Sequence, residues 1–286
     1  MIRRILAAVE SDATIERLIP WIRNLVPRPE LHLLKVFEPV YEAAVRPGIR
    51  MVDPRQRSMG ERLLQEARRR LGISARIHVA EGFVAPTILR IAQDVKADLI
   101  GIVSRVRGEV GRRLFGGATE RLLYGSEIPM LSIPSWPDAL PDPQIRRILV
   151  PMDGSEFSEM VLPLARSLAL AHSAELVFAH VRTDAAVPRP QFDMERRLQQ
   201  LVERLRAESV QAVASIRTGR LPTALILVMD ETRPNLVVMG VHGLGATERL
   251  LMGSTASALL RDSPIPILAA KYKAMKSWVG QPGFIP

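Results

Sequence analysis

The sequence predicts an α/β protein of two tandem domains, each with a doubly wound (Rossmann-like) parallel sheet of five strands in the order 3-2-1-4-5. Three observations predict this fold: a length of 286 residues, an internal repeat, and short runs rich in Val, Ile and Leu that alternate with helical patterns. Such runs indicate buried parallel strands joined by right-handed helical crossovers. We expect the domains to span residues 1–140 and 141–286.

The internal repeat places the same landmarks in the same order in both halves. The landmarks separated by 137 residues are Asp98 and Asn235, Gly116 and Gly253, and Pro129 and Pro266. Residues 3–10 match residues 146–153 at an offset of 143, and the changing offset indicates small differences in loop length. The expected linker is the segment 134–143, whose four prolines are unsuited to a helix interior or a central strand, and we place the boundary near Pro141.

The second half shows the alternation of elements most clearly. The segments expected to be strands, because they are short and apolar, are 148–152, 176–181, 210–216, 236–240 and 265–270. The first expected helix opens at Ser155 and carries apolar residues at spacings of three and four, at Met160, Leu164, Ala165 and Leu168. Further helices are expected at 194–207, at 222–231 with a proline near the start, and at 255–261.

A ligand site in such a sheet lies beyond the carboxyl ends of the strands, where the winding reverses. In the order 3-2-1-4-5 the reversal lies between strands 1 and 4, so Asp153 and the loop after Met239 share one edge. That loop has the pattern Gly-x2-Gly-x9-Gly-Ser, from Gly240 to Ser254, and leads into a helix. Glycines allow backbone amides to face an anion, and a helix N-terminus favours phosphate.

These motifs together resemble the universal stress protein family in its tandem two-domain form. The resemblance rests on residues 148–156 (ILVPMDGSE), on the glycine loop and on residues 264–268 (PIPIL), and it covers nearly the whole chain except 271–286. It implies a site for ATP or another adenine nucleotide, with Mg²⁺ held mostly by phosphate oxygens and not by the protein alone. The nucleotide-binding residues that it implies are Pro151, Met152, Asp153, Val181, Met239, Gly240, His242, Gly243, Gly253, Ser254 and Thr255.

The first half departs from the glycine pattern. The replacements, read at the repeat offsets, are Glu10 for Asp153, Val103 for Gly240, Val106 for Gly243, Gly117 for Ser254 and Ala118 for Thr255. A β-branched residue occupies space and restricts the backbone where phosphate would have to lie. We therefore expect one nucleotide site, in the second half, although Gly108, Gly111, Gly116 and Gly117 leave open a different ligand loop in the first.

Each of these residues also allows a structural interpretation. Asp153 could cap the following helix with Gly154 and Ser155, and Ser254 and Thr255 could cap the last helix. The glycines could serve as turns alone, and His242 could be an ordinary loop residue. His180 is expected to pack or to hydrogen-bond the backbone at a strand end.

No catalytic set is visible in the sequence. The chain has no cysteine, no Gly-Lys-Ser/Thr phosphate loop, no dinucleotide Gly-x-Gly-x-x-Gly after the first strand and no histidine-rich metal motif. This favours an ATP-binding regulatory protein of the stress response over an enzyme. Two alternatives remain: a slow ATPase or adenylyl- or phosphate-transferring enzyme that uses the same pocket, and a nucleotide-free interaction module.

Charge and hydropathy narrow the expected partners. The net charge is +9, but the arginines are scattered over helix faces and aromatic residues are few, so nucleic acid and membrane surfaces are not favoured. No segment approaches about 18 apolar residues, and a soluble cytoplasmic protein is expected. The apolar edge strands at 129–133 and 265–270 suggest an internal pseudo-dimer, and they leave open a homodimer and an unidentified protein partner.

Overall fold

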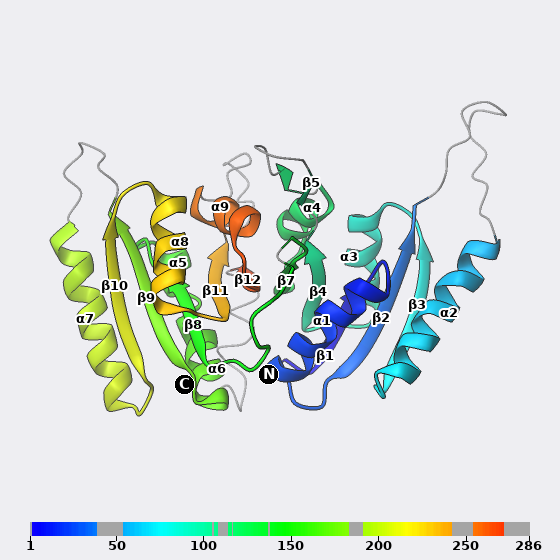
Figure 1. The fold of residues 1–286 in the computed structure, drawn as a ribbon, viewed down its shortest axis with the longest axis horizontal. Helices are drawn as coiled ribbons and strands as arrows, with labels where there is room; N and C mark the ends of the chain where they lie inside the picture. Colours follow the sequence, from blue (N-terminus) through cyan, green and yellow to red (C-terminus); the bar gives the residue numbers. More distant parts are fainter. Residues whose placement is uncertain are drawn as a thin grey trace. The chain divides into compact units, whose positions relative to one another are not determined.

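The chain forms two compact units in a computed structural model (Figure 1). One unit comprises Ile2–Arg105 and Phe115–Ser135, and the other contains Trp136 onward together with Val106–Leu114. We call them the first and the second domain. The residues that the structure describes are 2–38, 54–104, 106–107, 114–115, 117–136, 138–182, 191–241 and 254–271.

The first domain has a parallel sheet of order β3-β2-β1-β4-β7. Its strands are β1 (Arg4–Ala8), β2 (Glu30–Phe37), β3 (Ala75–Glu81), β4 (Leu99–Ser104) and β7 (Met130–Pro134). Its helices are α1 (Asp12–Leu25), α2 (Pro54–Arg70), α3 (Val84–Asp94) and α4 (Gly117–Gly125). A separate two-stranded ladder pairs β5 (Val106–Arg107) with β6 (Leu114–Phe115).

The second domain repeats this topology in the order β10-β9-β8-β11-β12. Its strands are β8 (Arg147–Pro151), β9 (Glu175–Arg182), β10 (Ala212–Thr218), β11 (Leu236–Val241) and β12 (Ile267–Lys271). Its helices are α5 (Glu156–Glu159), α6 (Leu162–His172), α7 (Gln191–Ala207), α8 (Leu221–Thr232) and α9 (Ser254–Asp262). The predicted strand order 3-2-1-4-5 is confirmed.

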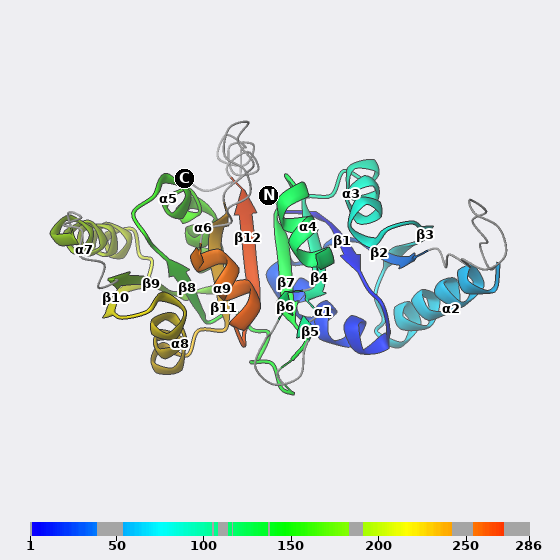
Figure 2. The same cartoon turned by 90° about the horizontal axis from the view of Figure 1, so that it is seen from above.

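Helices cover both faces of each sheet, as Figure 2 shows for α1 and α2 on one face of the first sheet and α3 and α4 on the other. This double cover explains why successive residues along the central strands are all buried. Ile5, Leu6 and Ala7 of β1 are 0% exposed, although their side chains point alternately to opposite faces. The uninterrupted apolar runs of the sequence are therefore the signature of these buried parallel strands.

Two local predictions were wrong, and both concern proline. The helix predicted to run on from Ser155 is broken after Glu159 and begins again at Leu162. Pro163 has no amide to donate to Glu159, four residues earlier, and its ring would clash with that carbonyl, so it lies in the first turn of α6 instead. Pro134, assigned to the linker, is the last residue of β7, where its carbonyl accepts from Arg17 Nε at 2.9 Å.

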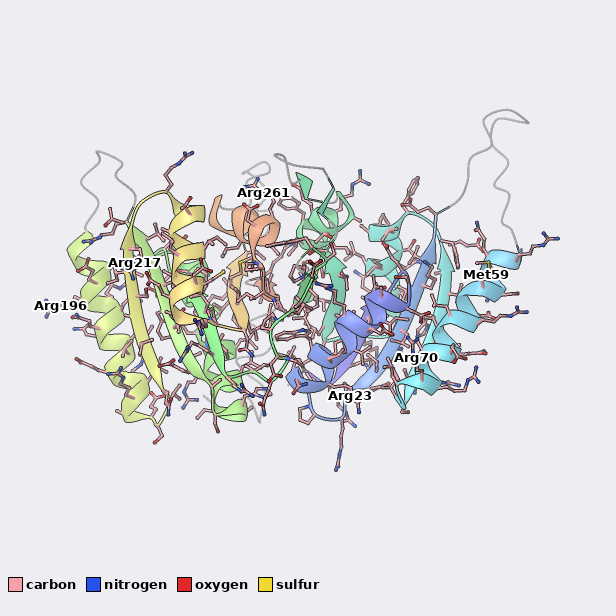
Figure 3. All side chains as sticks on the ribbon, viewed as in Figure 1. Arg23, Met59, Arg70, Arg196, Arg217 and Arg261 are labelled. Carbon is pink, nitrogen blue, oxygen red and sulfur yellow. The ribbon has the colours of Figure 1, made fainter. Side chains whose placement is uncertain are left out.

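Charged side chains of each domain are turned outward. Figure 3 shows Arg23 and Arg196 extending from α1 and α7 into solvent. Arg70 pairs with Asp12 and Glu16 of α1 at 3.3 and 2.9 Å. Such exposed pairs contribute little to stability, and they indicate that at least part of the arginine excess lies on solvated surfaces.

Both domains have, at the amino end of the sheet, a polar side chain whose oxygen accepts hydrogen bonds from two backbone amides. In the first domain Asp98 Oδ2 accepts from the backbone amides of Arg3 and Arg4 at 3.0 and 2.7 Å. Because Asp98 directly precedes β4, its carboxylate ties the start of strand 4 to the start of strand 1.

The second domain uses Asn235 for the same purpose and adds two bonds. Its Oδ1 accepts from the amides of Arg146 and Arg147, each at 3.2 Å. Its Nδ2 donates to the carbonyls of Asp142, at 3.0 Å, and Gln144. Asn235 is only 8% exposed, so water cannot readily replace these partners.

We expect Asn235→Ala to lower the free energy of unfolding of the second domain by about 3 kcal/mol, because it leaves buried amides and carbonyls without partners. Urea unfolding followed by fluorescence measures the change. Asp98→Asn is the matched control, since the amide oxygen can accept from the same two amides, and it should shift the first domain little. A wild-type midpoint for Asn235→Ala would contradict the role assigned to this side chain.

Candidate functional site

The chain turns sharply where β8 ends, and hydrogen bonds to β9 hold the turn. The amide of Met152 donates to the carbonyl of Ala179 at 2.8 Å, which extends the ladder by one residue. His180 Nδ1 lies 2.8 Å from the carbonyl oxygen of Met152. Because a carbonyl can only accept, His180 must carry its proton on Nδ1. The prediction that His180 binds the backbone at a strand end is confirmed.

Asp153 organises the residues that follow Met152. Its Oδ1 accepts from the amide of Ser155 at 2.9 Å and from the hydroxyl of Ser155 at 2.6 Å. Gly154 adopts a φ of +80°, which side chains disfavour, and this delays the start of α5 to Glu156. The residue that caps α5 is Ser155, whose Oγ accepts from the amide of Ser158 at 3.2 Å, and Asp153 holds Ser155 in place.

The environment of Asp153 favours its ionised form. Burial raises the pKa of this carboxyl, but hydrogen bonds from Ser155 and Ser158 together lower it more, so the pKa lies below its ordinary value. The residue as a whole is exposed. A negative charge is thus held at the carboxyl edge of β8, within reach of solvent.

The strands on either side of the winding reversal separate near this edge. The pairing of β8 with β11 consists of Leu236 with Ile148 and Val237 with Leu149. Beyond these pairs β8 continues with β9 to Pro151, and β11 continues with β12 to Val241. The carboxyl ends of β8 and β11 are therefore not joined by ladder pairs, which is the arrangement expected at a ligand-binding switch point.

The structure places most of the predicted site residues at this edge. Pro151 ends β8 and Met152 follows it, Val181 lies near the end of β9, and Met239 and Gly240 lie near the end of β11. Helix α9 begins at Ser254, but the side chains of Ser254 and Thr255 are not described. His242, Gly243 and Gly253 lie outside the described residues, so their role stays a prediction.

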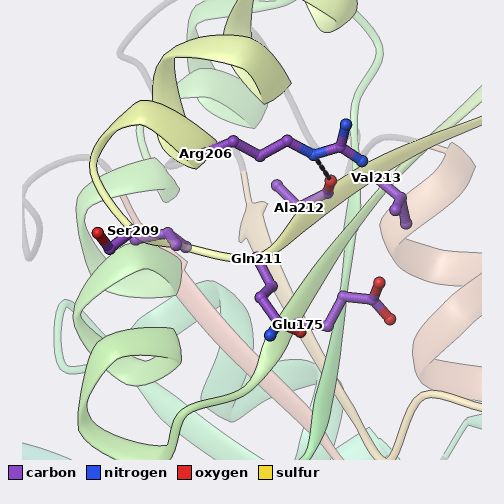
Figure 4. A pocket seen from close by; sticks show the side chains of 7 residues that line it. Glu175, Arg206, Ser209, Gln211, Ala212 and Val213 are labelled. Atoms are coloured by element: carbon purple, nitrogen blue, oxygen red, sulfur yellow. Dashed lines mark hydrogen bonds between the residues drawn. The ribbon is translucent and has the colours of Figure 1, made fainter.

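Two cavities are formed by described residues of the second domain, and neither was foreseen from the sequence. One, of about 290 Å³, borders the turn at Met152 and is lined further by Leu162, Met194, Arg197 and neighbours on α7. The other, of about 330 Å³, lies at the amino ends of β9 and β10, where Arg206 Nε donates to the carbonyl of Ala212 at 2.9 Å (Figure 4). The second cavity is thus at the opposite edge of the sheet from Asp153.

The first domain has different chemistry at the corresponding edge. Ser11 caps α1 at once, through a reciprocal capping box with Thr14, and no glycine intervenes. Lys35, which takes the place of His180, donates from Nζ to the carbonyl of Glu10 at 2.7 Å. Its ammonium also lies 5.1 Å from the centre of the Phe37 ring, and burial lowers its pKa. Gly108, Gly111 and Gly116 lie outside the described residues.

The part of the chain that the structure describes has neither a metal-binding cluster of side chains nor a helix suited to a membrane. Those residues contain no group of three or more His, Asp or Glu side chains placed to hold a metal ion. None of the helices described is long and apolar enough to cross a membrane.

Comparison with known proteins gives a consistent family. The model of the universal stress protein family matches twice, over residues 1–134 and 144–271. A universal stress protein of Mycobacterium tuberculosis is 30% identical over 196 residues, which cover 65% of this chain and 65% of the relative. A universal stress protein of Thermus aquaticus is 29% identical over 136 residues, or 44% of this chain and 98% of the relative.

A solved structure shows the same fold over nearly the full length. The crystal structure of a universal stress protein from Archaeoglobus fulgidus matches with a TM-score of 0.75 at 21% identity, covering 94% of this chain and 98% of the other. The two family matches account for both domains. The chain belongs to the universal stress protein family, in its tandem two-domain form.

Proposed function

We propose that this protein is an adenine nucleotide-binding regulatory protein of the stress response, with one ATP site in the second domain. The observation that carries the proposal is the parting of β8 and β11 at the winding reversal, with Asp153 and Gly240 on the same edge. Membership of the universal stress protein family supports it. An open edge between these strands is where nucleotides bind in doubly wound sheets.

The base and sugar would lie against the β8 turn. Met152 is only 4% exposed, and its amide and carbonyl are already bonded to Ala179 and His180, so it supports the turn and has no free backbone donor for the ligand. Asp153, ionised and exposed, can accept from an adenine amino group or a ribose hydroxyl. The polar recognition at this end of the ligand therefore depends on one carboxylate.

The phosphates would lie at the start of α9. Gly240 presents backbone without a side chain, and the first amides of a helix have no partner within the helix. Each hydrogen bond from a backbone amide to a charged phosphate oxygen contributes about 1.5–3 kcal/mol, and the helix dipole adds to this. Mg²⁺ would be bound mainly by the phosphate oxygens, which supply the hard ligands that it prefers.

The chemistry of Asp153 favours binding over catalysis. A carboxylate whose pKa is lowered by hydrogen bonds is a weak general base, and Oδ1 already accepts two bonds from Ser155. Apart from His242, which lies outside the described residues, the other polar groups predicted for the site are amides and hydroxyls, which would orient a ligand. We therefore favour a nucleotide-dependent regulator over an ATPase.

The first domain is proposed not to bind nucleotide in this way. The ammonium of Lys35 is fixed on the carbonyl of Glu10, across the end of β1, where the second domain has His180 on Met152. Val103 in β4 carries a branched side chain where β11 has Gly240. These substitutions alter both sides of the corresponding edge.

We expect Mg·ATP at about a hundred times its dissociation constant to stabilise the protein by about 2.7 kcal/mol, a shift of several degrees in the unfolding temperature. Gly253→Val should abolish the shift, because a side chain would enter the phosphate loop. Gly116→Val, at the equivalent position of the first domain, is the matched control and should leave the shift intact, as should Glu10→Ala. Differential scanning fluorimetry measures all four proteins.

Other outcomes would favour the alternatives. The lack of a shift with any adenine nucleotide would contradict the proposal and support a nucleotide-free interaction module. Phosphate release in a single-turnover assay, lost in Asp153→Ala, would instead support an ATPase. Both assays use the full-length chain.

Because the pKa of Asp153 is lowered in the folded protein, we expect the stability of the second domain to depend on this residue in acid. Its contribution to folding is present above the ordinary carboxyl value of 3.8 and is lost as the pH falls through the lower pKa of the folded state. Asp153→Asn keeps an acceptor for Ser155 but does not titrate, so its second domain should lose less stability between pH 6 and pH 3. Urea midpoints at the two pH values test this, and equal losses in both proteins would refute it.

A further inference from the structure

The first domain contains a pair of histidines that share one hydrogen bond. His32 Nδ1 of β2 lies 2.8 Å from His78 Nε2 of β3, and the ring centroids are 5.1 Å apart with an interplanar angle of 13°. The separation of the centroids equals the N···N distance plus the distance from each ring centre to its own nitrogen. The two centroids and the two nitrogens therefore lie on one line, and the small interplanar angle means that the rings meet edge to edge in nearly one plane. The hydrogen bond is therefore linear and lies in the plane of both imidazoles.

Glu30 influences the positions of the protons through its charge, since His32 Nε2 makes no hydrogen bond within the described part of the chain. Its Oε1 lies 3.5 Å from His32 Nε2, and its Oε2 accepts from Arg4 Nε at 3.1 Å. A carboxylate oxygen favours a proton on the nitrogen that faces it, so His32 bears its hydrogen on Nε2 and accepts at Nδ1. His78 must then donate a hydrogen bond from Nε2 to His32 Nδ1, while His32 Nε2 faces Glu30.

The pair is held neutral by its surroundings. His32 is 2% exposed, and burial lowers its pKa, an effect that Glu30 partly opposes. Burial also lowers the pKa of His78, helped by His32 and by the guanidinium of Arg76. Arg76 reaches Glu30 only at 3.9 Å, and Arg4 faces the pair from β1.

Helices α2 and α3 both contact β2, but α2 lies over Phe37 and Val79, whose side chains point to the other face from His32 and His78. The helix on the histidine face adds no net charge. Helix α3 contacts β2, and its Arg90 and Asp94 pair with each other at 3.1 Å. Lys96 follows the helix, and its carbonyl accepts from Arg4 Nη1 at 3.2 Å. The charged groups of the described residues that act on the histidines are therefore Glu30, Arg4 and Arg76.

The second domain lacks the pair although it keeps the scaffold. Arg147 pairs with Glu175 at 2.5 Å, as Arg4 pairs with Glu30, and both glutamates stand at the start of the second strand. Two residues further on, Val177 takes the place of His32, and it pairs in the ladder with Val213, as His32 does with Arg76. Ser215 then corresponds to His78. The histidines are thus not needed for this fold.

We propose that Glu30, His32 and His78 form an acid-sensitive latch that holds edge strand β3 against β2 at neutral pH and weakens when the histidines bind protons. A first proton can enter at His78 Nδ1 without breaking the hydrogen bond. A second would place two N–H groups face to face at 2.8 Å and break it. Acid would thereby loosen the first domain, which has lost the glycine pattern, while the second keeps its stability.

The direction of the pH effect follows from the two histidines. Their lowered folded-state pKa values mean that the unfolded chain binds more protons below the ordinary value of 6.5. The contribution of the histidines to the free energy of unfolding of the first domain is complete above that value and decreases as the pH drops below it. The pKa of Glu30 is also lowered, chiefly by its bond to Arg4, so this carboxylate loses its contribution only below 4.5.

The test compares wild type with the double variant His32→Val/His78→Ser, which installs the residues of the second domain. From the ordinary value of 6.5 down to pH 5 the unfolding constant of the wild-type first domain should rise faster than that of the variant, by up to about tenfold per pH unit for one proton and a hundredfold for two, while the two proteins should change alike between pH 7.5 and 6.5. Urea unfolding gives the constants, and hydrogen exchange of the β3 amides shows whether that strand opens first. Equal pH dependence in the two proteins would overturn the proposal.

Nuclear magnetic resonance of the wild-type side chains tests the latch without any substitution. At pH 7.5 both imidazoles should be neutral with their protons on Nε2, and both should titrate below the ordinary value of 6.5. A proton on Nδ1 of His32, or ordinary titration of both rings, would refute the latch even if the double variant failed to fold.

Discussion

Burial of each parallel sheet on both faces is the constraint on which the rest of the structure depends. Because helices cover the two faces, the middle of each central strand is apolar, and polar groups that could bind a ligand lie mainly at the strand ends. The order β10-β9-β8-β11-β12 then separates β8 from β11 at the carboxyl edge. The site at Asp153 follows from topology before any side chain is considered.

The two domains share the same sheet and core contacts and differ at the carboxyl edge of the sheet. Both domains tie strand 4 to strand 1 through one polar side chain, Asp98 or Asn235, and both keep an arginine–glutamate pair between strands 1 and 2. They differ where β1 and β8 end, since Gly154 allows an open turn in the second domain and Ser11 closes the first directly into a helix. A shared core thus supports one edge at which we propose nucleotide binding and another edge with a lysine fixed across it.

The sequence was sufficient to predict the strand order, because apolar runs report burial and topology directly, and the structure places Asp153 and Gly240 at the same edge of the sheet, as predicted. It did not reveal the break at Pro163, which depends on competition between helix periodicity and one missing amide. It also missed the bond between His32 and His78, because those residues are 46 positions apart and meet only through the register of β2 with β3. The phosphate loop lies mostly outside the described residues, so Gly253 stays a prediction.

The central claim is that nucleotide binding belongs to one domain of the two. Isothermal titration of the full-length chain with Mg·ATP, combined with amide chemical-shift mapping, tests it most directly. The account predicts one nucleotide per chain, with the largest shifts at Asp153, Gly240 and the start of α9. Two nucleotides per chain, or shifts centred on Glu10 and Val103, would contradict it.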